Sequence, residues 1–329
     1  MDNTNNTDII KNENSQIERL SQQLKISNKI IAQSDKYFKK ITDEFTIRKA
    51  IKLARYSRFT VDGFYNPNEF DGFDEDNIYS EILEKLNSFN SNFSPYTLFY
   101  LPKKAGMKRT AYYIPFVEYC IRFIIGIVVY DEYKNDFLDN IYGGKDDVFK
   151  FNKNNSFKNF SNWQFTTAYS YNFLYSVDIK SFFDTINQDL LLDSIRSKLT
   201  LNKTDYFYKV LKCAIKFDFS QVVLEKSQIS ESLSGLIVGS RVDGFFQNIV
   251  LSTIDNKLKN LPNIAYGRFT DDIKIFCYNN VDGENVLQIL QIELEKLGLN
   301  LNLSKSQIQD LKKHEIQLKN HYTTKICVM

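Results

Sequence analysis

The sequence predicts an α+β fold in which an antiparallel sheet is backed by helices. Residues 174–178 form an apolar, β-prone run, and residues 265–277 contain two such runs separated by a short polar turn. Apolar residues instead recur at helical spacing over residues 242–251, and an apolar stretch at residues 119–130 is the expected buried helix. With 329 residues, the chain is long enough for about two compact lobes.

Overall composition is typical of a globular protein and does not identify a partner. Apolar residues make up 43% of the chain, with 27 Phe and 20 Tyr. The formal net charge is only +2, which is too small to predict nucleic-acid binding by itself. The local distribution of charge therefore has to decide which ligands the chain could hold.

The N-terminal region, residues 1–41, is predicted to be a disordered tail followed by one helix. Residues 1–14 are rich in Asn and lack the apolar content that a packed core needs. Four apolar residues between Ile17 and Ile31 have the spacing of an amphipathic helix. We expect that helix to pack on the core or on a partner.

A basic segment precedes the expected buried helix. Residues 101–109 are rich in lysine and arginine, and a basic hairpin facing an acidic site would suit a triphosphate and a nucleic-acid backbone. A solvated, charged turn is the alternative. Farther along, residues 152–163 are polar and Asn-rich and are predicted to be a loop. The basic side chains between Leu101 and Asp131 are Lys103, Lys104, Lys108, Arg109 and Arg122.

Asp178 ends the apolar run that begins at Leu174, and the pattern changes to helical spacing after it. A carboxylate at the end of a buried strand is costly unless it is paired or binds a metal ion. Magnesium binds oxygen ligands, usually one or two carboxylates with phosphates and waters. A helix N-cap is the alternative role for Asp178.

Glycines at 235 and 239 precede the helical pattern at 242–251. Because glycine lets the backbone turn sharply and approach a ligand, Gly239 and the adjacent Ser240 are candidate substrate-binding residues. A structural loop followed by a core helix is the alternative, and the segment taken by itself favours that alternative.

The acidic pair Asp271-Asp272 lies at the turn between the two predicted strands of residues 265–277. A hairpin tip that presents two carboxylates could hold two divalent cations together with Asp178. Acidic pairs are usually surface features. The pair Asp146-Asp147, which follows two glycines and a lysine, is expected to be such an ordinary solvated turn.

These segments, in this order, resemble the palm motifs of reverse transcriptases, in particular those of group II introns and retrons. The resemblance covers roughly residues 95–310. The basic hairpin corresponds to 101–109, and the four palm motifs correspond to 177–186, 235–241, 269–272 and 297–305.

The resemblance implies a right-hand polymerase fold. Fingers would comprise residues 42–170 and the palm residues 171–310, with a helical insertion at 187–232 that packs with the fingers. Residues 311–329 would be a short tail, so that a thumb is reduced or absent. Ile237 and Val238 stand where many members have proline and glutamine, which points to the bacterial abortive-infection and defence-associated branch and hence to antiphage defence.

The activity implied by the resemblance is that of an RNA-directed DNA polymerase, a nucleotidyltransferase that adds deoxynucleotides to a 3′-hydroxyl. Two Mg²⁺ ions, or Mn²⁺ in their place, would assist this reaction. The implied metal ligands are Asp178, Asp271, Asp272 and the backbone carbonyl of Ile179.

The resemblance also assigns residues around the nucleotide. Arg109, with Lys103 or Lys104, would neutralise the triphosphate, and Lys305 would stabilise the departing pyrophosphate. Phe183 stands five residues after Asp178, at the family's aromatic sugar gate, and would exclude a ribose 2′-hydroxyl. A surface lysine and a core aromatic are the alternatives for Lys305 and Phe183.

The implied partners are deoxynucleoside triphosphates and an RNA template, DNA or both. A structured non-coding RNA, a protein partner or a second copy of the chain could supply contacts that a thumb would otherwise make. Two other functions stay open. The chain could be a non-catalytic nucleic-acid-binding scaffold, or it could carry out untemplated or protein-primed DNA synthesis within a complex.

Cysteine usage and hydropathy favour a cytoplasmic protein with no membrane attachment. The four cysteines lie far apart without metal-ligand spacing, and Cys120 and Cys277 fall in apolar runs. The longest apolar run, residues 123–130, is too short to cross a bilayer. Acidic residues in the polar N-terminus argue against a secretory signal.

Overall fold

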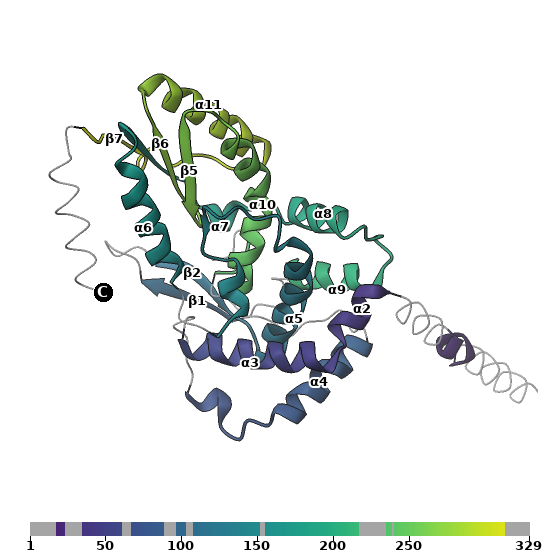
Figure 1. The fold of residues 1–329 in the computed structure, drawn as a ribbon. Helices are drawn as coiled ribbons and strands as arrows, with labels where there is room; N and C mark the ends of the chain where they lie inside the picture. Colours follow the sequence, from purple (N-terminus) through teal and green to yellow (C-terminus); the bar gives the residue numbers. More distant parts are fainter. Residues whose placement is uncertain are drawn as a thin grey trace, which may run out of the picture.

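The computed structural model describes residues 18–23, 35–60, 67–88, 97–102, 108–151, 155–216, 235–238 and 240–312. Helices α3 and α4 lie at one end of the molecule and α11 lies at the other, with α5 and α10 between them (Figure 1). Single 3₁₀ turns are formed by Pro67–Phe70 and Asp146–Phe149. The helices are α2 (Lys36–Ile41), α3 (Glu44–Thr60), α4 (Glu75–Ser88), α5 (Phe116–Tyr133), α6 (Ser156–Ala168), α7 (Phe182–Thr185), α8 (Gln188–Lys198), α9 (Tyr206–Ile215), α10 (Arg241–Lys259) and α11 (Asn280–Lys296).

The strands form a separate hairpin and a five-stranded sheet. The sheet has the order β3-β5-β6-β4-β7, and every neighbouring pair is antiparallel except β3 with β5. The predicted antiparallel sheet is therefore confirmed, with one short parallel strand added at its edge. The strands are β1 (Thr97–Pro102), β2 (Lys108–Tyr113), β3 (Ile141–Tyr142), β4 (Phe173–Asp178), β5 (Ile264–Phe269), β6 (Asp272–Cys277) and β7 (Gln307–Asp310).

One face of the sheet is buried under α10 and α11. Tyr175 and Val177 on β4 pair directly with Ile275 and Ile273 on β6, and all four side chains are buried. At Gly283 of α11, an added Cβ would lie 2.3 Å from the Tyr175 ring, so the helix backbone rests on that ring. This alternation of buried residues along each strand follows from the two-residue period of a sheet.

The opposite face of the sheet carries α6, which corrects the sequence prediction. Residues 152–163 were expected to form a loop, but Ser156–Ala168 is helical. Phe160 and Trp163 lie one turn apart and point the same way. The Trp163 ring meets Phe276 edge-on at 5.6 Å and covers Gly267, where a Cβ would lie 2.5 Å from the ring. Burial of these rings on the sheet outweighs the weak helix propensity of an Asn-rich segment.

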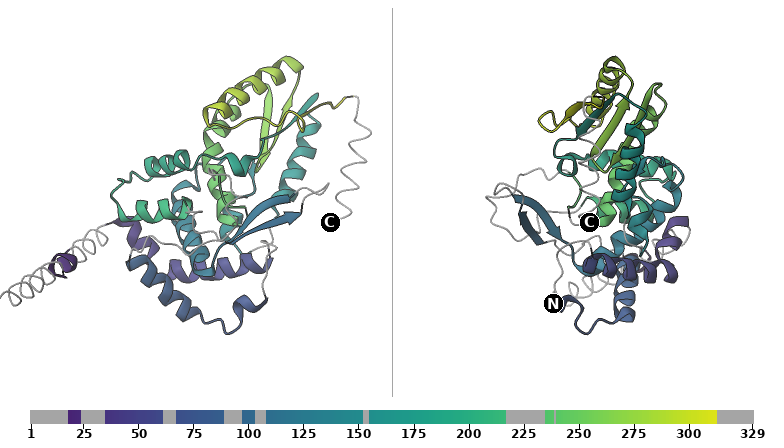
Figure 2. Two further views of the ribbon diagram at one scale, coloured as in Figure 1. Left: turned by 180° about the vertical axis from the view of Figure 1, so that it is seen from behind. Right: turned by 60° about the vertical axis from the view of Figure 1, so that its left-hand side comes forward.

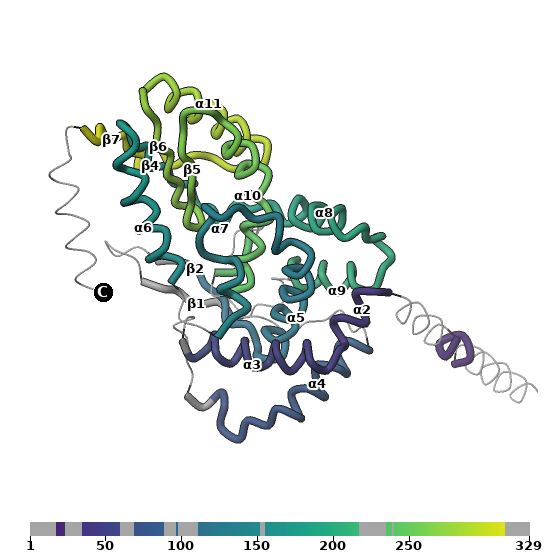
Figure 3. The backbone as a smooth tube through the Cα atoms, viewed as in Figure 1, coloured from purple at the N-terminus to yellow at the C-terminus, as the bar shows by residue number. Residues whose placement is uncertain are grey.

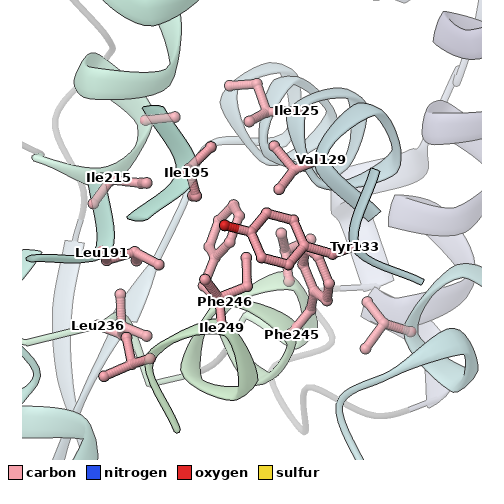
Figure 4. Close-up of a cluster of buried hydrophobic side chains, with 14 of the residues drawn as sticks. Ile125, Val129, Tyr133, Leu191, Ile195, Ile215, Leu236, Phe245, Phe246 and Ile249 are labelled. Atoms are coloured by element: carbon pink, nitrogen blue, oxygen red, sulfur yellow. The ribbon is translucent and has the colours of Figure 1, made fainter. Parts of the chain in front are cut away.

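Between the sheet and the α3–α4 end, α5 and α10 pack with α8 and α9 around a cluster of aliphatic and aromatic side chains (Figure 4). The helices predicted at 119–130 and 242–251 are thereby confirmed as α5 and α10. Cys120 and Cys277 are buried, as their apolar context indicated. Residues at the centre of the cluster include Ile125, Val129, Tyr133, Leu191, Ile195, Phe245, Phe246 and Ile249.

At the N-terminal side, residues 18–23 are helical and exposed, while the rest of the amphipathic helix predicted between Ile17 and Ile31 lies outside the described residues. The main body begins at α2, and the course of the backbone from there to β7 can be followed in Figure 3. Within the described ranges, no helix combines the length and the hydropathy needed to cross a bilayer.

The core cluster leads to a stability prediction. Replacing Phe245, which is fully buried on α10, with alanine should lower the free energy of unfolding by about 3–5 kcal/mol, because the ring leaves a cavity between α10 and α5. Urea denaturation monitored by circular dichroism measures the change. Ile292→Ala on the exposed side of α11 is the control and should change stability by about 0.5 kcal/mol or less. Equal losses in both variants would contradict the assigned core.

Candidate active site

Two of the predicted carboxylates stand opposite each other on neighbouring strands. Asp178, the last residue of β4, is the register partner of Asp272, the first residue of β6. Directly opposed residues in an antiparallel pair have Cβ atoms roughly 5 Å apart. Asp271 precedes Asp272 in the turn from β5. The sheet therefore brings Asp178, Asp271 and Asp272 to the same end of its strands, which we call the carboxylate edge.

The turn that presents Asp271 is tight. Phe269 pairs with Asp272, so only Thr270 and Asp271 connect the two strands. Thr270 adopts a positive φ of 55°, which is uncommon for a β-branched residue. Its hydroxyl donates a hydrogen bond of 2.9 Å to Asp271 Oδ1. Backbone strain of this kind persists only where surrounding contacts enforce it.

Arg268 supplies those contacts, and sequence reasoning did not identify it. Its guanidinium is fully buried and donates from Nη1 to the Thr270 carbonyl at 2.9 Å. The Nε and Nη2 atoms form a bidentate pair with Asp255 of α10 at 2.8 and 2.7 Å. Tyr266 donates to the same carboxylate at 2.6 Å, and Asn248 Oδ1 accepts from Nη1 at 2.6 Å. The sequence did contain one signal for this residue, because Arg268 is a charged residue within the predicted strand before the acidic pair.

The same network reaches the segment after β3. Asn248 donates to the carbonyls of Gly143 and Gly144, both at 2.9 Å. Gly144 has a φ of +67°, and an added Cβ there would lie 2.1 Å from the Gly244 carbonyl oxygen, so only glycine fits.

The pair Asp146-Asp147 is not the ordinary solvated turn that the sequence suggested. It begins a 3₁₀ helix in which both residues are half-buried. Asp147 Oδ1 accepts from the Lys145 amide at 2.8 Å, and the Asp147 carbonyl accepts from Arg241 at 2.5 Å. The second of these contacts comes from α10, which local sequence could not indicate.

Asp178 is oriented by the loop that leads into β7. The Asn302 amide side chain donates to Asp178 Oδ2 at 2.9 Å, and its backbone N–H donates to the Asp178 carbonyl at 2.8 Å. Lys305 Nζ lies 3.2 Å from the same Oδ2 atom. The N-cap position of α7 is occupied by Ser181, so the alternative of Asp178 as an N-cap is wrong. Asn302 was not singled out from sequence.

The other two carboxylates differ in their surroundings. Lys274 Nζ lies 2.9 Å from Asp272 Oδ1. Burial raises the pKa of Asp271, and the negative charges of Asp178 and Asp272 raise it further, although hydrogen bonds from Thr270 and from its own amide act in the opposite direction. Two lysines and three carboxylates therefore balance much of the charge at this edge.

The carboxylates are chemically suited to hard divalent cations, since all three offer oxygen ligands at one edge and two of them already attract an ammonium group. Among the residues that the structure describes, no three Asp, Glu, His or Cys side chains converge closely enough to hold a metal as they stand. Asp178 and Asp272 would have to turn from Lys305 and Lys274 to do so.

The loop of residues 235–238 lies against Phe183. The Leu236 amide donates to the Phe183 carbonyl at 2.8 Å, and Gln188 donates to the Gly235 carbonyl at 2.7 Å. Gly235 has a φ of +107°, and a Cβ there would lie 2.3 Å from the Phe183 oxygen. The Phe183 ring is partly buried and packs on the core beside Phe182.

This loop is also tied to α5, α10 and β2. Arg122 Nη2 donates to both carboxylate oxygens of buried Asp243, at 2.5 and 2.6 Å, and Asp243 accepts a 3.4 Å bond from the Ile237 amide. The Val238 carbonyl accepts from Tyr112 of β2 at 3.3 Å. The loop thus connects the β1–β2 hairpin to the helical core.

The remaining predicted site residues are placed as follows. Ser240 is buried immediately before α10, and Ile179 is buried one residue beyond Asp178. Arg109 lies in β2 opposite Leu101. Lys103, Lys104 and Gly239 lie outside the described residues.

Comparison with protein families gives a match to the family model described as reverse transcriptase (RNA-dependent DNA polymerase), over residues 135–318. That range contains all three carboxylates at the sheet edge and more than half of the chain. No curated protein matches the sequence.

Solved structures that match include telomerases from two Candida species. An apo telomerase from Candida tropicalis, truncated from its C-terminal domain, has 15% identity and a TM-score of 0.47, covering 66% of this chain and 50% of that one. The Candida albicans telomerase in complex with a fragment of telomeric RNA has 12% identity and a TM-score of 0.46, covering 71% of this chain and 45% of that one. This chain therefore spans about half the length of those proteins.

The Arg268 network leads to a graded prediction. Arg268→Gln should lower the free energy of unfolding by about 3–5 kcal/mol, because it leaves the buried Asp255 carboxylate without its partner. Tyr266→Phe removes one hydrogen bond to the same carboxylate and should cost about 0.5–3 kcal/mol. Urea denaturation of the two variants tests the order. A larger loss for Tyr266→Phe would contradict the central role given to Arg268.

Proposed function

The chain belongs to the reverse transcriptase family, and from that premise we propose that it adds deoxynucleotides to a 3′-hydroxyl as an RNA-directed DNA polymerase. The observation that carries the proposal is the meeting of Asp178, Asp271 and Asp272 at one edge of the sheet. In the right-hand polymerase fold, residues 171–310 would act as the palm and residues 42–170 as the fingers.

The carboxylates would hold two Mg²⁺ ions, or Mn²⁺, with the Ile179 carbonyl as a further ligand. When bound, such ions lower the pKa of an attacking hydroxyl and stabilise charge on a departing pyrophosphate. The chain's own contribution is rigidity. Arg268 fixes the backbone next to Asp271, and Asn302 holds Asp178 Oδ2. Because these groups are oriented before substrate binds, they need little reorganisation during the reaction.

The nucleotide would lie between this edge and the β1–β2 hairpin. In the proposal, Arg109 with Lys103 or Lys104 neutralises the triphosphate, and Gly239 and Ser240 line the pocket. Lys305 is proposed to leave Asp178 and meet the pyrophosphate. Its 66% exposed side chain, in contact with Asp178 through Nζ alone at 3.2 Å, supports that mobility.

Phe183 is proposed to exclude ribonucleotides. Its backbone carbonyl is fixed by Leu236 and its ring is held on one side by the core, which supports a rigid wall next to the sugar. A rigid aromatic wall discriminates through the clash with a 2′-hydroxyl.

We assign the chain to the bacterial defence-associated branch on Ile237 and Val238. Ile237 is fully buried, so an apolar residue suits its position, and the Val238 carbonyl accepts a hydrogen bond from Tyr112 of the β1–β2 hairpin. A role in antiphage defence follows as part of the proposal. An RNA or DNA template, a structured RNA, a protein partner or a second copy of the chain are the proposed binding partners.

Loss of a carboxylate tests the proposal directly. Asp271→Asn and Asp178→Asn should each reduce incorporation of labelled deoxynucleotides at least on the order of a hundredfold, because an amide cannot replace an anionic ligand. Primer extension with Mg²⁺ measures the effect. Asp193→Asn is the matched control, since Asp193 is exposed on α8 and pairs only with Arg196 among the described residues, and it should retain full activity. Undiminished activity of Asp271→Asn would refute the assignment.

The sugar gate has its own test. Phe183→Val should lower the ratio of kcat/KM for deoxynucleotide over ribonucleotide by roughly tenfold or more, because the smaller side chain leaves room for the 2′-hydroxyl. Steady-state incorporation of both nucleotides measures the ratio. Tyr278→Val, which alters an exposed aromatic residue directly after β6, should leave it unchanged. An active Phe183→Val variant with the wild-type ratio would return Phe183 to a purely structural role.

A further inference from the structure

Lys274 is a largely buried cation to which the proposed reaction assigns no role. It lies two residues after Asp272 on β6, and its Nζ atom is 2.9 Å from Asp272 Oδ1. Only 15% of the Lys274 side chain is exposed, although lysine side chains usually reach into water. Lys305, which pairs with Asp178 at the carboxylate edge, is 66% exposed. The two lysines therefore differ in their freedom to move away from their carboxylates.

The neighbouring strands explain how Lys274 can be buried. Directly opposite it stand two small residues, Ser176 on β4 and Gly267 on β5, and all three lie on the face of the sheet that carries α6. The Trp163 ring of α6 covers Gly267, where an added Cβ would lie 2.5 Å from the ring. In Figures 1 and 2, α6 lies beside the β5–β6 hairpin. The small neighbours thus leave room for the aliphatic stem of Lys274 against the sheet.

The sheet also brings the Lys274 ammonium group to Asp272. Side chains two residues apart along a strand point to the same side, so Asp272 shares the face of Lys274. Asp178, the register partner of Asp272, lies on that face as well. A carboxylate that is paired with an ammonium group is a weaker ligand for a second cation, because the two cations repel each other. Lys274 therefore acts on a carboxylate that the proposed reaction needs.

We propose that Lys274 is a positioning residue that keeps Asp272 partly neutralised and thereby sets the affinity of the carboxylate edge for divalent cations. Lys305 can move into solvent when a cation arrives. The stem of Lys274 is held against the sheet, so a cation at Asp272 has to share that carboxylate with the ammonium group. The inference rests on the proposed function, which places divalent cations at the carboxylate edge.

Binding of Mn²⁺ to the metal-free full chain, followed by electron paramagnetic resonance, tests the proposal without any substrate. Lys274→Met removes the charge but keeps an unbranched side chain, and it should lower the Kd for Mn²⁺ roughly threefold to tenfold, because the repulsion between two cations is lost. Lys274→Gln should show the same gain, and Lys274→Arg, which keeps the charge, should bind Mn²⁺ with the wild-type Kd. An unchanged or raised Kd in both neutral variants would overturn the inference.

Two other lysines provide matched comparisons. Lys198, at the end of α8, pairs with Asp136 at 2.6 Å, and Lys198→Met should leave the Kd for Mn²⁺ unchanged. Lys305→Met removes an equal charge from the carboxylate edge, but from a side chain that is already free to move away. Its effect on Kd should therefore be smaller than that of Lys274→Met. Equal effects of these two variants would contradict the role given to the burial of Lys274.

A double-mutant cycle tests whether Lys274 acts through Asp272. Lys274→Met should lower the Kd by a smaller factor in an Asp272→Asn background than in the wild type, because no carboxylate is then released. An equal factor in both backgrounds would mean that Lys274 acts through its charge alone, and it would overturn the positioning role.

Mn²⁺ binding and primer extension separate this inference from the proposed function. Tighter Mn²⁺ binding by Lys274→Met, in a chain whose wild type does not polymerise, would refute the proposed activity alone. Normal polymerisation by the wild type, together with Mn²⁺ binding that Asp271→Asn abolishes and Lys274→Met leaves unchanged, would refute the role of Lys274 alone.

Discussion

The buried guanidinium of Arg268 is the contact on which the candidate active site depends. It joins β5 to α10 through Asp255, and it also donates a hydrogen bond to the carbonyl of Thr270, the residue before Asp271. A buried arginine is tolerable only when its hydrogen bonds are satisfied and its charge is paired. The requirement to bury this ion pair therefore fixes the hairpin on its supporting helix and keeps Thr270 in an unfavourable backbone conformation.

A second set of contacts positions the other side of the site. Residues 235–238 accept hydrogen bonds from α8 and β2, and they donate to Asp243 of α10 and to the Phe183 carbonyl. The buried Arg122–Asp243 pair anchors this loop to α5. The loop thereby links the β1–β2 hairpin to the Phe183 backbone.

Charge at the sheet edge is balanced within the chain. Lys305 lies next to Asp178, and Lys274 lies next to Asp272. The pKa of Asp271 is raised because its carboxyl is buried and lies near the negative charges of Asp178 and Asp272. Carboxylates crowded in this way bind cations readily, since a cation relieves both repulsion and desolvation.

The sequence by itself determined the strand ending at Asp178, the hairpin around Asp271-Asp272, and the buried helices α5 and α10. Each of these depends on periodicity or turn chemistry among residues close in the chain. Tertiary structure alone decided that the Asn-rich segment forms α6, that Asp147 is tied to α10, and that Arg268 meets Asp255 and Asn302 meets Asp178. Those features depend on partners far away in the chain, whose position is fixed only once the sheet register and helix packing are formed.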